Sequence, residues 1–174
     1  MKKIIIALSK GRILDETLPF LEKNNIIINE DITKTRKLIL TTNNKNIDII
    51  IIRGIDVPTY VKYGFADIGI TGRDILKEQK IEKEIYYLKS LNTAKCRLSL
   101  IAKNKKKYFN NIKNKKKLYI ATKYINITKK YFLSKKININ IIKFHGCIEL
   151  CPLLNISDAI VDLISSGTTM KFNN

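Results

Sequence analysis

Short apolar runs alternate with amphipathic stretches along the chain. The runs at 4–8, 47–52, 118–122 and 158–164 predict buried strands, because continuous apolar segments of this length bounded by turn residues are typical of them. Residues 12–25 predict a helix with Leu14, Leu18 and Leu21 on one face, in which Pro19 should introduce a kink or shift the start. Further strands are expected at 37–41, 66–71, 96–102 and 137–144, and further helices at 56–64, 74–80 and 123–134.

This alternation predicts an α/β protein with mainly parallel sheets. The composition changes after residue 88, which favours two lobes, residues 1–92 and 93–174, with a ligand cleft between them. No apolar run approaches the roughly 20 residues that span a bilayer. The N-terminal run is shorter than the roughly 7–15 apolar residues of a signal peptide. We therefore expect a cytoplasmic protein without a membrane partner.

The formal net charge of +18 raises the possibility of nucleic-acid binding. The densest basic block, residues 103–117, mixes lysine with asparagine and holds few aromatic residues, so we interpret it as a solvated surface and expect no nucleic-acid partner. Cys96, Cys147 and Cys151 lack the spacing of a metal site, and we expect reduced, mostly buried thiols. Arginine is preferred where phosphate is gripped at two points, so some of the five arginines should lie in a site.

The strongest chemical pattern is DAIVDLISSGTTM at 158–170. An apolar strand carrying Asp158 and Asp162 leads into a loop of hydroxyls and glycine, residues 165–169, whose backbone N–H groups could bind an anion. Two carboxylates upstream suit the hydroxyls of a ribose. The segment thus has the layout of a 5-phosphoribosyl site, although a strand and an ordinary Ser/Thr-rich turn would have the same composition.

Two weaker patterns also lie at predicted strand ends, where α/β sites collect. Arg53 ends one strand, and Thr71 and Gly72 end the next. The turn at 9–12, Ser-Lys-Gly-Arg, combines a hydroxyl, two cations and a glycine without the spacing of a P-loop.

Along nearly its whole length the sequence resembles the short form of the ATP phosphoribosyltransferase family, which begins histidine biosynthesis. The matching stretches, in the family's order, are ALSKGRILDE, RKLI, RGIDVPTYVKYGFADIGITGRDIL, KCRLSLIA, IATKY, IELCPLL and DAIVDLISSGTTM. The resemblance implies two α/β lobes similar to a type II periplasmic binding protein. It also implies ATP and phosphoribosyl pyrophosphate as substrates, and N1-(5-phosphoribosyl)-ATP and pyrophosphate as products.

The resemblance also implies site residues. Asp158 and Asp162 would hold the ribose hydroxyls, and Arg53 and Arg36 would face the pyrophosphate as catalytic residues. Glu149 would line the site or serve as a helix-start carboxylate. The 5-phosphate would be wrapped by Ser165, Ser166, Gly167, Thr168 and Thr169. The nucleotide would be bordered by Lys10, Gly11, Arg12, Asp67 and Thr71.

Mg²⁺, held mainly by substrate rather than by protein ligands, is the implied cofactor. The implied assembly is a homodimer within a hetero-oligomer that contains a regulatory subunit resembling histidyl-tRNA synthetase. Family members continue beyond the position of Asn174 with a further strand and helix, so the second lobe is expected to be truncated. A catalytically decayed member and a two-lobed protein that binds a small anion remain the alternatives.

Overall fold

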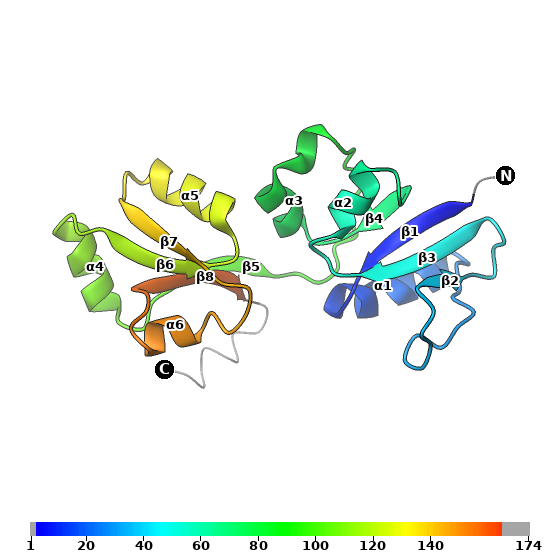
Figure 1. Ribbon diagram of the computed structural model, residues 1–174, viewed down its shortest axis with the longest axis horizontal. Coiled ribbons are helices and arrows are strands. Elements are labelled where there is room, and N and C mark those ends of the chain that lie inside the picture. The colour runs from blue at the N-terminus through cyan, green and yellow to red at the C-terminus, as the bar shows by residue number, and fades with distance from the viewer. Residues whose placement is uncertain (1–2, 165–174) are drawn as a thin grey trace. The chain divides into compact units, whose positions relative to one another are not determined.

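The structure is a computed structural model that describes residues 3–164. By internal contacts the chain divides into two compact units, Met1–Ala94 and Lys95–Asn174, called unit 1 and unit 2 below. Each contains one four-stranded sheet, and in each sheet two strand pairs are parallel and one is antiparallel (Figure 1). The predicted α/β class with mainly parallel sheets is confirmed. Among the described residues, no helix is both long and apolar enough to cross a membrane.

Unit 1 has the strand order β2-β3-β1-β4. Strands β1, β3 and β4 run parallel, while β2 is antiparallel to β3. The strands are β1 (Ile4–Ser9), β2 (Ile39–Thr41), β3 (Ile47–Ile52) and β4 (Ile68–Ile70). The helices are α1 (Arg12–Lys23), α2 (Val57–Lys62) and α3 (Arg73–Gln79), followed by the 3₁₀ turn η1 (Ile81–Lys83).

Side chains that alternate along β1 supply two cores in unit 1. Ile6 and Leu8 pack with Leu14 and Leu21 of α1, whereas Ala7 packs with Val57 of α2. Successive residues of a strand face opposite sides of the sheet, so α1 and α2 cover opposite faces. Burial of a side chain such as Leu8, which is fully enclosed, contributes about 1.5–3 kcal/mol.

Unit 2 has the order β5-β8-β6-β7. Strands β8, β6 and β7 are parallel neighbours, and β5 is antiparallel to β8. The strands are β5 (Arg97–Ile101), β6 (Leu118–Thr122), β7 (Ile139–Lys143) and β8 (Ala159–Ile164). The helices are α4 (Lys105–Lys113), α5 (Ile125–Ser134) and α6 (Leu150–Leu153).

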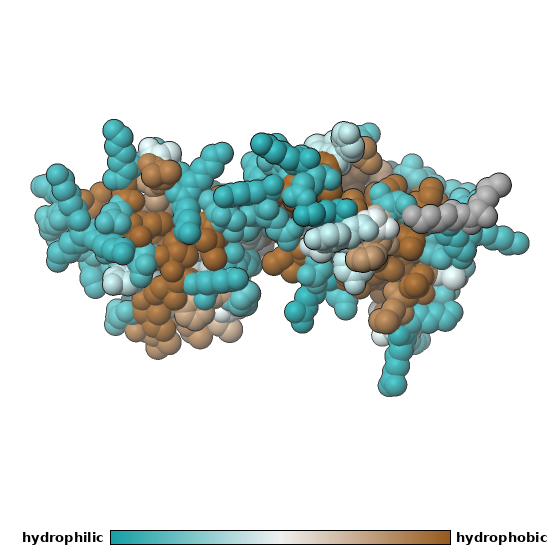
Figure 2. All heavy atoms as spheres, turned by 45° about the horizontal axis from the view of Figure 1, so that its top comes forward, coloured by the Kyte–Doolittle hydropathy of each residue, from teal (hydrophilic) through white to brown (hydrophobic). Residues whose placement is uncertain are grey.

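Unit 2 repeats the two-faced packing. Ile120 lies in a core with Tyr108 of α4 and Phe132 of α5, whereas its neighbour Ala121 packs with Cys151 of α6 (Figure 1). The basic block predicted to be solvated forms α4 and its flanks, and its lysines are exposed. On the face seen in Figure 2, hydrophilic side chains cover much of each unit and leave several apolar areas open.

The cysteine prediction is wrong in part. None of the three cysteines, all within the described residues, forms a disulfide, but only Cys151 is buried. Cys96 and Cys147 are exposed because they lie outside the strands and helices that build the cores. Burial raises the pKa of the Cys151 thiol above its ordinary value of 9.0.

Candidate functional site

The carboxyl ends of the three parallel strands of unit 1 meet at one edge of the sheet. The register pairs Ser9 with Ile52 and Leu8 with Ile70, so β1, β3 and β4 end side by side. Lys10 extends the first pairing by donating its N–H to the Ile52 carbonyl at 2.9 Å. In an open α/β sheet this edge is where ligands bind.

The turns that follow these strands are packed against one another. A Cβ atom on Gly54 would lie 2.5 Å from Ser9 Oγ, so a side chain at residue 54 would displace the Ser9 hydroxyl at the end of β1. The Thr71 hydroxyl, just after β4, donates to the Gly54 carbonyl at 2.9 Å. Close contact between three strand ends gives this edge one defined shape.

Several cations lie at this edge. Lys10 and Arg12 flank Gly11, and Arg53 follows β3; all three side chains belong to exposed residues. Gly11 has φ 81° and ψ −151°, a conformation that only glycine adopts readily, and it allows α1 to begin directly at Arg12. The partial positive charge at the start of this 12-residue helix adds to the cationic character. The structure thus gathers the predicted residues Lys10, Gly11, Arg12, Arg53 and Thr71 at one sheet edge.

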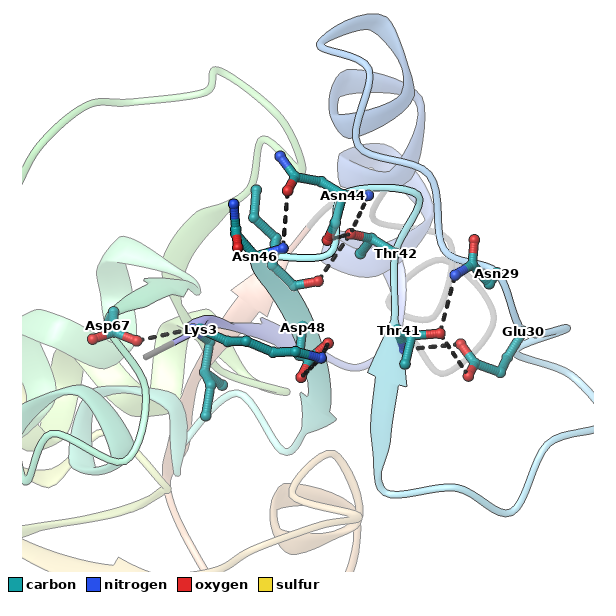
Figure 3. A network of polar contacts seen from close by, with 11 residues as sticks. Lys3, Asn29, Glu30, Thr41, Thr42, Asn44, Asn46, Asp48 and Asp67 are labelled. Atoms are coloured by element: carbon teal, nitrogen blue, oxygen red, sulfur yellow. Dashed lines mark hydrogen bonds and ion pairs between the residues drawn. The ribbon is translucent and has the colours of Figure 1, made fainter. Parts of the chain in front are cut away.

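Asp67 does not lie at this edge. Its N–H donates to the Ile5 carbonyl and its Oδ2 accepts the Ile5 N–H, both at 2.9 Å, at the amino end of β1 (Figure 3). Asp67 and Thr71 are four positions apart, which corresponds to about 13 Å at about 3.3 Å per residue. The Asp67 carboxylate holds the start of β4 against β1, and its contact with the nucleotide stays a prediction.

Asp158 makes the same contact in unit 2. Its N–H donates to the Tyr119 carbonyl and its Oδ2 accepts the Tyr119 N–H, both at 2.8 Å. Its other oxygen accepts from Asn111 of α4 at 3.2 Å. Asp158 therefore holds the amino end of β8 against β6, and a cavity of about 160 Å³ lies beside it at that edge.

Asp162 lies at the other end of β8, about 13 Å further along the strand. Two carboxylates this far apart cannot hold the hydroxyls of one ribose, so the predicted pairing of Asp158 with Asp162 is corrected. The Asp162 carboxylate forms an ion pair with Lys123, with Nζ 3.2 Å from Oδ1. The predicted phosphate loop, Ser165 to Thr169, begins three residues later and lies outside the described residues.

Lys123 is a functional candidate that we did not single out from the sequence. It follows β6, and its Nζ lies 5.3 Å from the centroid of the Tyr124 ring. The Tyr124 N–H donates to Thr122 Oγ1, which in turn donates to the Val161 carbonyl. These bonds fix the end of β6 beside β8. The IATKY stretch contained the signal, because a lysine directly after a buried parallel strand falls at the ligand-binding edge.

No contact described for Arg36 or Glu149 places either residue at the ligand-binding edge of a sheet. Arg36 is exposed in the segment between α1 and β2. Glu149 is exposed at the start of α6, where its side chain makes no capping hydrogen bond. Within residues 3–164, no group of three or more His, Cys, Asp and Glu side chains could hold a metal ion.

Known proteins with similar sequences or structures supply the identification. The family model described as HisG, ATP phosphoribosyltransferase, matches residues 53–174. A relative named ATP phosphoribosyltransferase from Albidiferax ferrireducens is 47% identical over 98% of this chain and 80% of its own length. One of the same name from Janthinobacterium sp. (strain Marseille) is 44% identical over 99% of this chain and 78% of its own.

A solved structure agrees with them. The ATP phosphoribosyl transferase (HisG:HisZ) complex from Thermotoga maritima is similar with a TM-score of 0.78 and 31% identity, over 98% of this chain and 79% of that one. Two α/β units with polar strand ends and these relatives define a phosphoribosyltransferase, a class of glycosyltransferase. The chain belongs to the ATP phosphoribosyltransferase family.

Proposed function

We propose that the chain transfers the phosphoribosyl group of phosphoribosyl pyrophosphate to N1 of ATP through two sets of residues. Lys10, Arg12 and Arg53 in unit 1 meet the nucleotide and the pyrophosphate. Asp162 and Lys123 in unit 2, with the loop at 165–169, take the phosphoribosyl group. The observation that carries this assignment is the placement of these charged side chains at the carboxyl ends of parallel strands.

The chemistry explains why these residue types suffice. Adenine N1 attacks C1 of the ribose as pyrophosphate leaves, so negative charge grows on the leaving group and positive character on the ribose ring. Adenine N1 carries no proton that must be removed first, so the reaction needs no strong general base. His145, the single histidine of the chain, is exposed in unit 2 and has no assigned role.

The cations at the edge of unit 1 stabilise charge that develops on oxygen. Arg53 presents a planar guanidinium that can bind two phosphate oxygens at once, and it faces the pyrophosphate as it leaves. Arg36, which the family resemblance assigns to the same group, is exposed in the segment before β2. Lys10 and the start of α1 border the triphosphate.

Asp162 is the carboxylate we assign to the ribose hydroxyls. A carboxylate accepts hydrogen bonds from two hydroxyls, and its negative charge favours the positive character that grows on the ring. Lys123 pairs with Asp162 at 3.2 Å, and its ammonium group would be available for a phosphate oxygen when the ribose engages the carboxylate. Glu149, at the start of α6, is a further lining candidate.

We propose Mg²⁺ as the cofactor, which would supply positive charge that stabilises the departing pyrophosphate. Mg²⁺ keeps several waters and commonly takes its remaining ligands from one or two carboxylates and substrate phosphates. Asp162, the carboxylate that we assign to the site, could supply one protein ligand while substrate phosphates supply others. The chain's own part is to position the pyrophosphate with Arg53.

The proposed setting is the cytoplasm, in a hetero-oligomer with a HisZ-type regulatory subunit that resembles histidyl-tRNA synthetase. The similar structure from Thermotoga maritima is a HisG:HisZ complex, which supports such a partner. We further propose that two copies of this chain form a dimer within that assembly.

A coupled assay for phosphoribosyl-ATP, with and without the HisZ-type subunit, tests the proposal. Arg53→Ala should lower turnover by about 10²-fold while donor binding changes little, because the arginine acts on charge that develops in the transition state. Lys23→Ala, which removes an exposed cation in the last turn of α1, is the control. Wild-type turnover in Arg53→Ala would refute the leaving-group role. A protein that binds both substrates but never exchanges pyrophosphate into the donor would be an anion-binding protein instead.

A further inference from the structure

Glu16 of α1 makes two contacts that the proposed chemistry does not use. Its Oε1 accepts a hydrogen bond from Arg12 Nε at 2.7 Å, one helical turn earlier. Its Oε2 accepts the backbone N–H of Ala94, 78 residues away in sequence. A single carboxylate therefore joins a side chain at the proposed nucleotide edge to the residue at which unit 1 ends.

The contact with Arg12 fixes how the guanidinium is presented. A guanidinium has five N–H donors in a rigid plane, and the contact described for Glu16 uses only the one on Nε. The Nη groups remain in the same plane and can bind two oxygens of a phosphate. Because Gly11 starts the helix directly at Arg12, the arginine lies in the first turn, where the helix also favours an anion.

The contact with Ala94 stabilises a backbone conformation that is unfavourable for a residue other than glycine. Ala94 has φ 48° and Asn92 has φ 56°, both in the left-handed region, which costs a non-glycine residue roughly 1–2 kcal/mol. The charged acceptor on the Ala94 N–H offsets part of this cost. Unit 2 starts at the next residue, Lys95.

We propose that Glu16 is a positioning residue, which orients Arg12 toward the nucleotide phosphates with one oxygen and fixes the end of unit 1 at Ala94 with the other. The inference rests on the proposed role of Arg12 at the nucleotide edge. Because the same Glu16 carboxylate contacts both Arg12 and the Ala94 N–H, anion binding by Arg12 and the order of the backbone at Ala94 should affect each other.

A double-mutant cycle on ATP binding tests the first half. Glu16→Gln keeps the shape of the side chain and an oxygen that can accept the Ala94 N–H, but removes the charge that aligns Arg12. We expect Glu16→Gln to weaken ATP binding about tenfold in the full chain, measured by calorimetric titration. In an Arg12→Ala background the same change should matter less than about twofold, because the group it orients is gone. Glu22→Gln, an exposed carboxylate on the same helix, is the matched control and should behave as wild type.

Amide hydrogen exchange at Ala94 tests the second half without turnover. Glu16→Ala should raise the exchange rate of the Ala94 amide, while Glu16→Gln should largely preserve its protection. Equal losses of ATP affinity from Glu16→Gln with and without Arg12, or unchanged Ala94 exchange in Glu16→Ala, would overturn the inference. If the wild-type complex makes phosphoribosyl-ATP and Glu16→Gln matches Glu22→Gln, this inference fails alone and the proposed function stands.

Discussion

At the scale of single residues, position along a strand separates structural aspartates from the functional candidate. Asp67 and Asp158 each precede a strand and bind both backbone groups of a residue on the neighbouring strand. Asp162 lies near the opposite end of its strand and pairs with a lysine side chain. The sequence could not distinguish Asp158 from Asp162, because residues four apart on a strand face the same side although they lie about 13 Å apart.

Substitution of Asp158 should therefore mainly lower stability, whereas substitution of Asp162 should mainly lower activity. Asp158→Ala removes an acceptor of two hydrogen bonds and should lower the free energy of unfolding by about 2 kcal/mol, with the KM for phosphoribosyl pyrophosphate nearly unchanged. Asp162→Asn should leave the melting temperature within a few degrees and lower kcat/KM for that donor about 10²-fold. Urea titration and steady-state kinetics on both variants check this. Loss of activity in Asp158→Ala and loss of stability in Asp162→Asn would indicate instead that Asp158 binds the ribose.

Acid should break the Glu16 contacts only at low pH. The Ala94 N–H, and after it Arg12, lower the pKa of the Glu16 carboxyl from its ordinary value of 4.5. A lowered pKa means that the contacts stabilise the fold above about pH 4.5 and are lost as the pH falls through the lowered value. We expect Ala94 amide protection, corrected for intrinsic exchange, to persist on acidification to pH 4.5. Loss of protection near neutral pH would contradict the contact.

At the scale of elements, continuous apolar runs predicted the buried strands well, but the first and last residues of other strands were predicted poorly. The structure has β3 and β6 at the residues predicted from their continuous apolar runs. Strand β4 is only three residues long, since Asp67 serves as its clamp and Thr71 already bonds to the neighbouring turn. Lys123 and Glu16 were missed because contacts across 39 and 78 residues are not encoded in local spacing.

Gly69 tests how α2 rests on β4. A Cβ atom at residue 69 would lie 2.7 Å from Val57 and 2.8 Å from Val61, side chains on the face of α2. Gly69→Ala should therefore force α2 away from the sheet and destabilise the protein by about 1–3 kcal/mol in urea unfolding. Gly146→Ala, where a new Cβ would meet no atom within 4 Å, should change stability by less than about 0.5 kcal/mol. Equal changes in stability for Gly69→Ala and Gly146→Ala would contradict the close packing of α2 against β4.

At the scale of the whole molecule, the charge of +18 is spread over exposed lysines rather than concentrated in the assigned site. Such a surface attracts anions at long range, but salt screens that attraction. Only the few cations at the strand ends of unit 1 are expected to contact the nucleotide directly.

The salt dependence of binding distinguishes an ATP-binding protein from a nucleic-acid-binding protein. ATP contacts few cations, so its KM should rise less than about tenfold between 50 and 200 mM salt. Binding to a DNA duplex through many phosphates would weaken about 10³-fold or more over the same range. Enzyme kinetics and fluorescence anisotropy at matched salt concentrations provide the comparison. Tight DNA binding that persists at 200 mM salt would support a nucleic-acid partner.

The most direct measurement is phosphoribosyl-ATP formation from ATP and phosphoribosyl pyrophosphate, with Mg²⁺ and the HisZ-type subunit present. We expect the wild-type chain to form the product, Asp162→Asn to lose most of that activity, and Asp158→Ala to retain it at temperatures where the variant is folded. No product from the folded wild-type complex, or full activity in Asp162→Asn, would contradict the account.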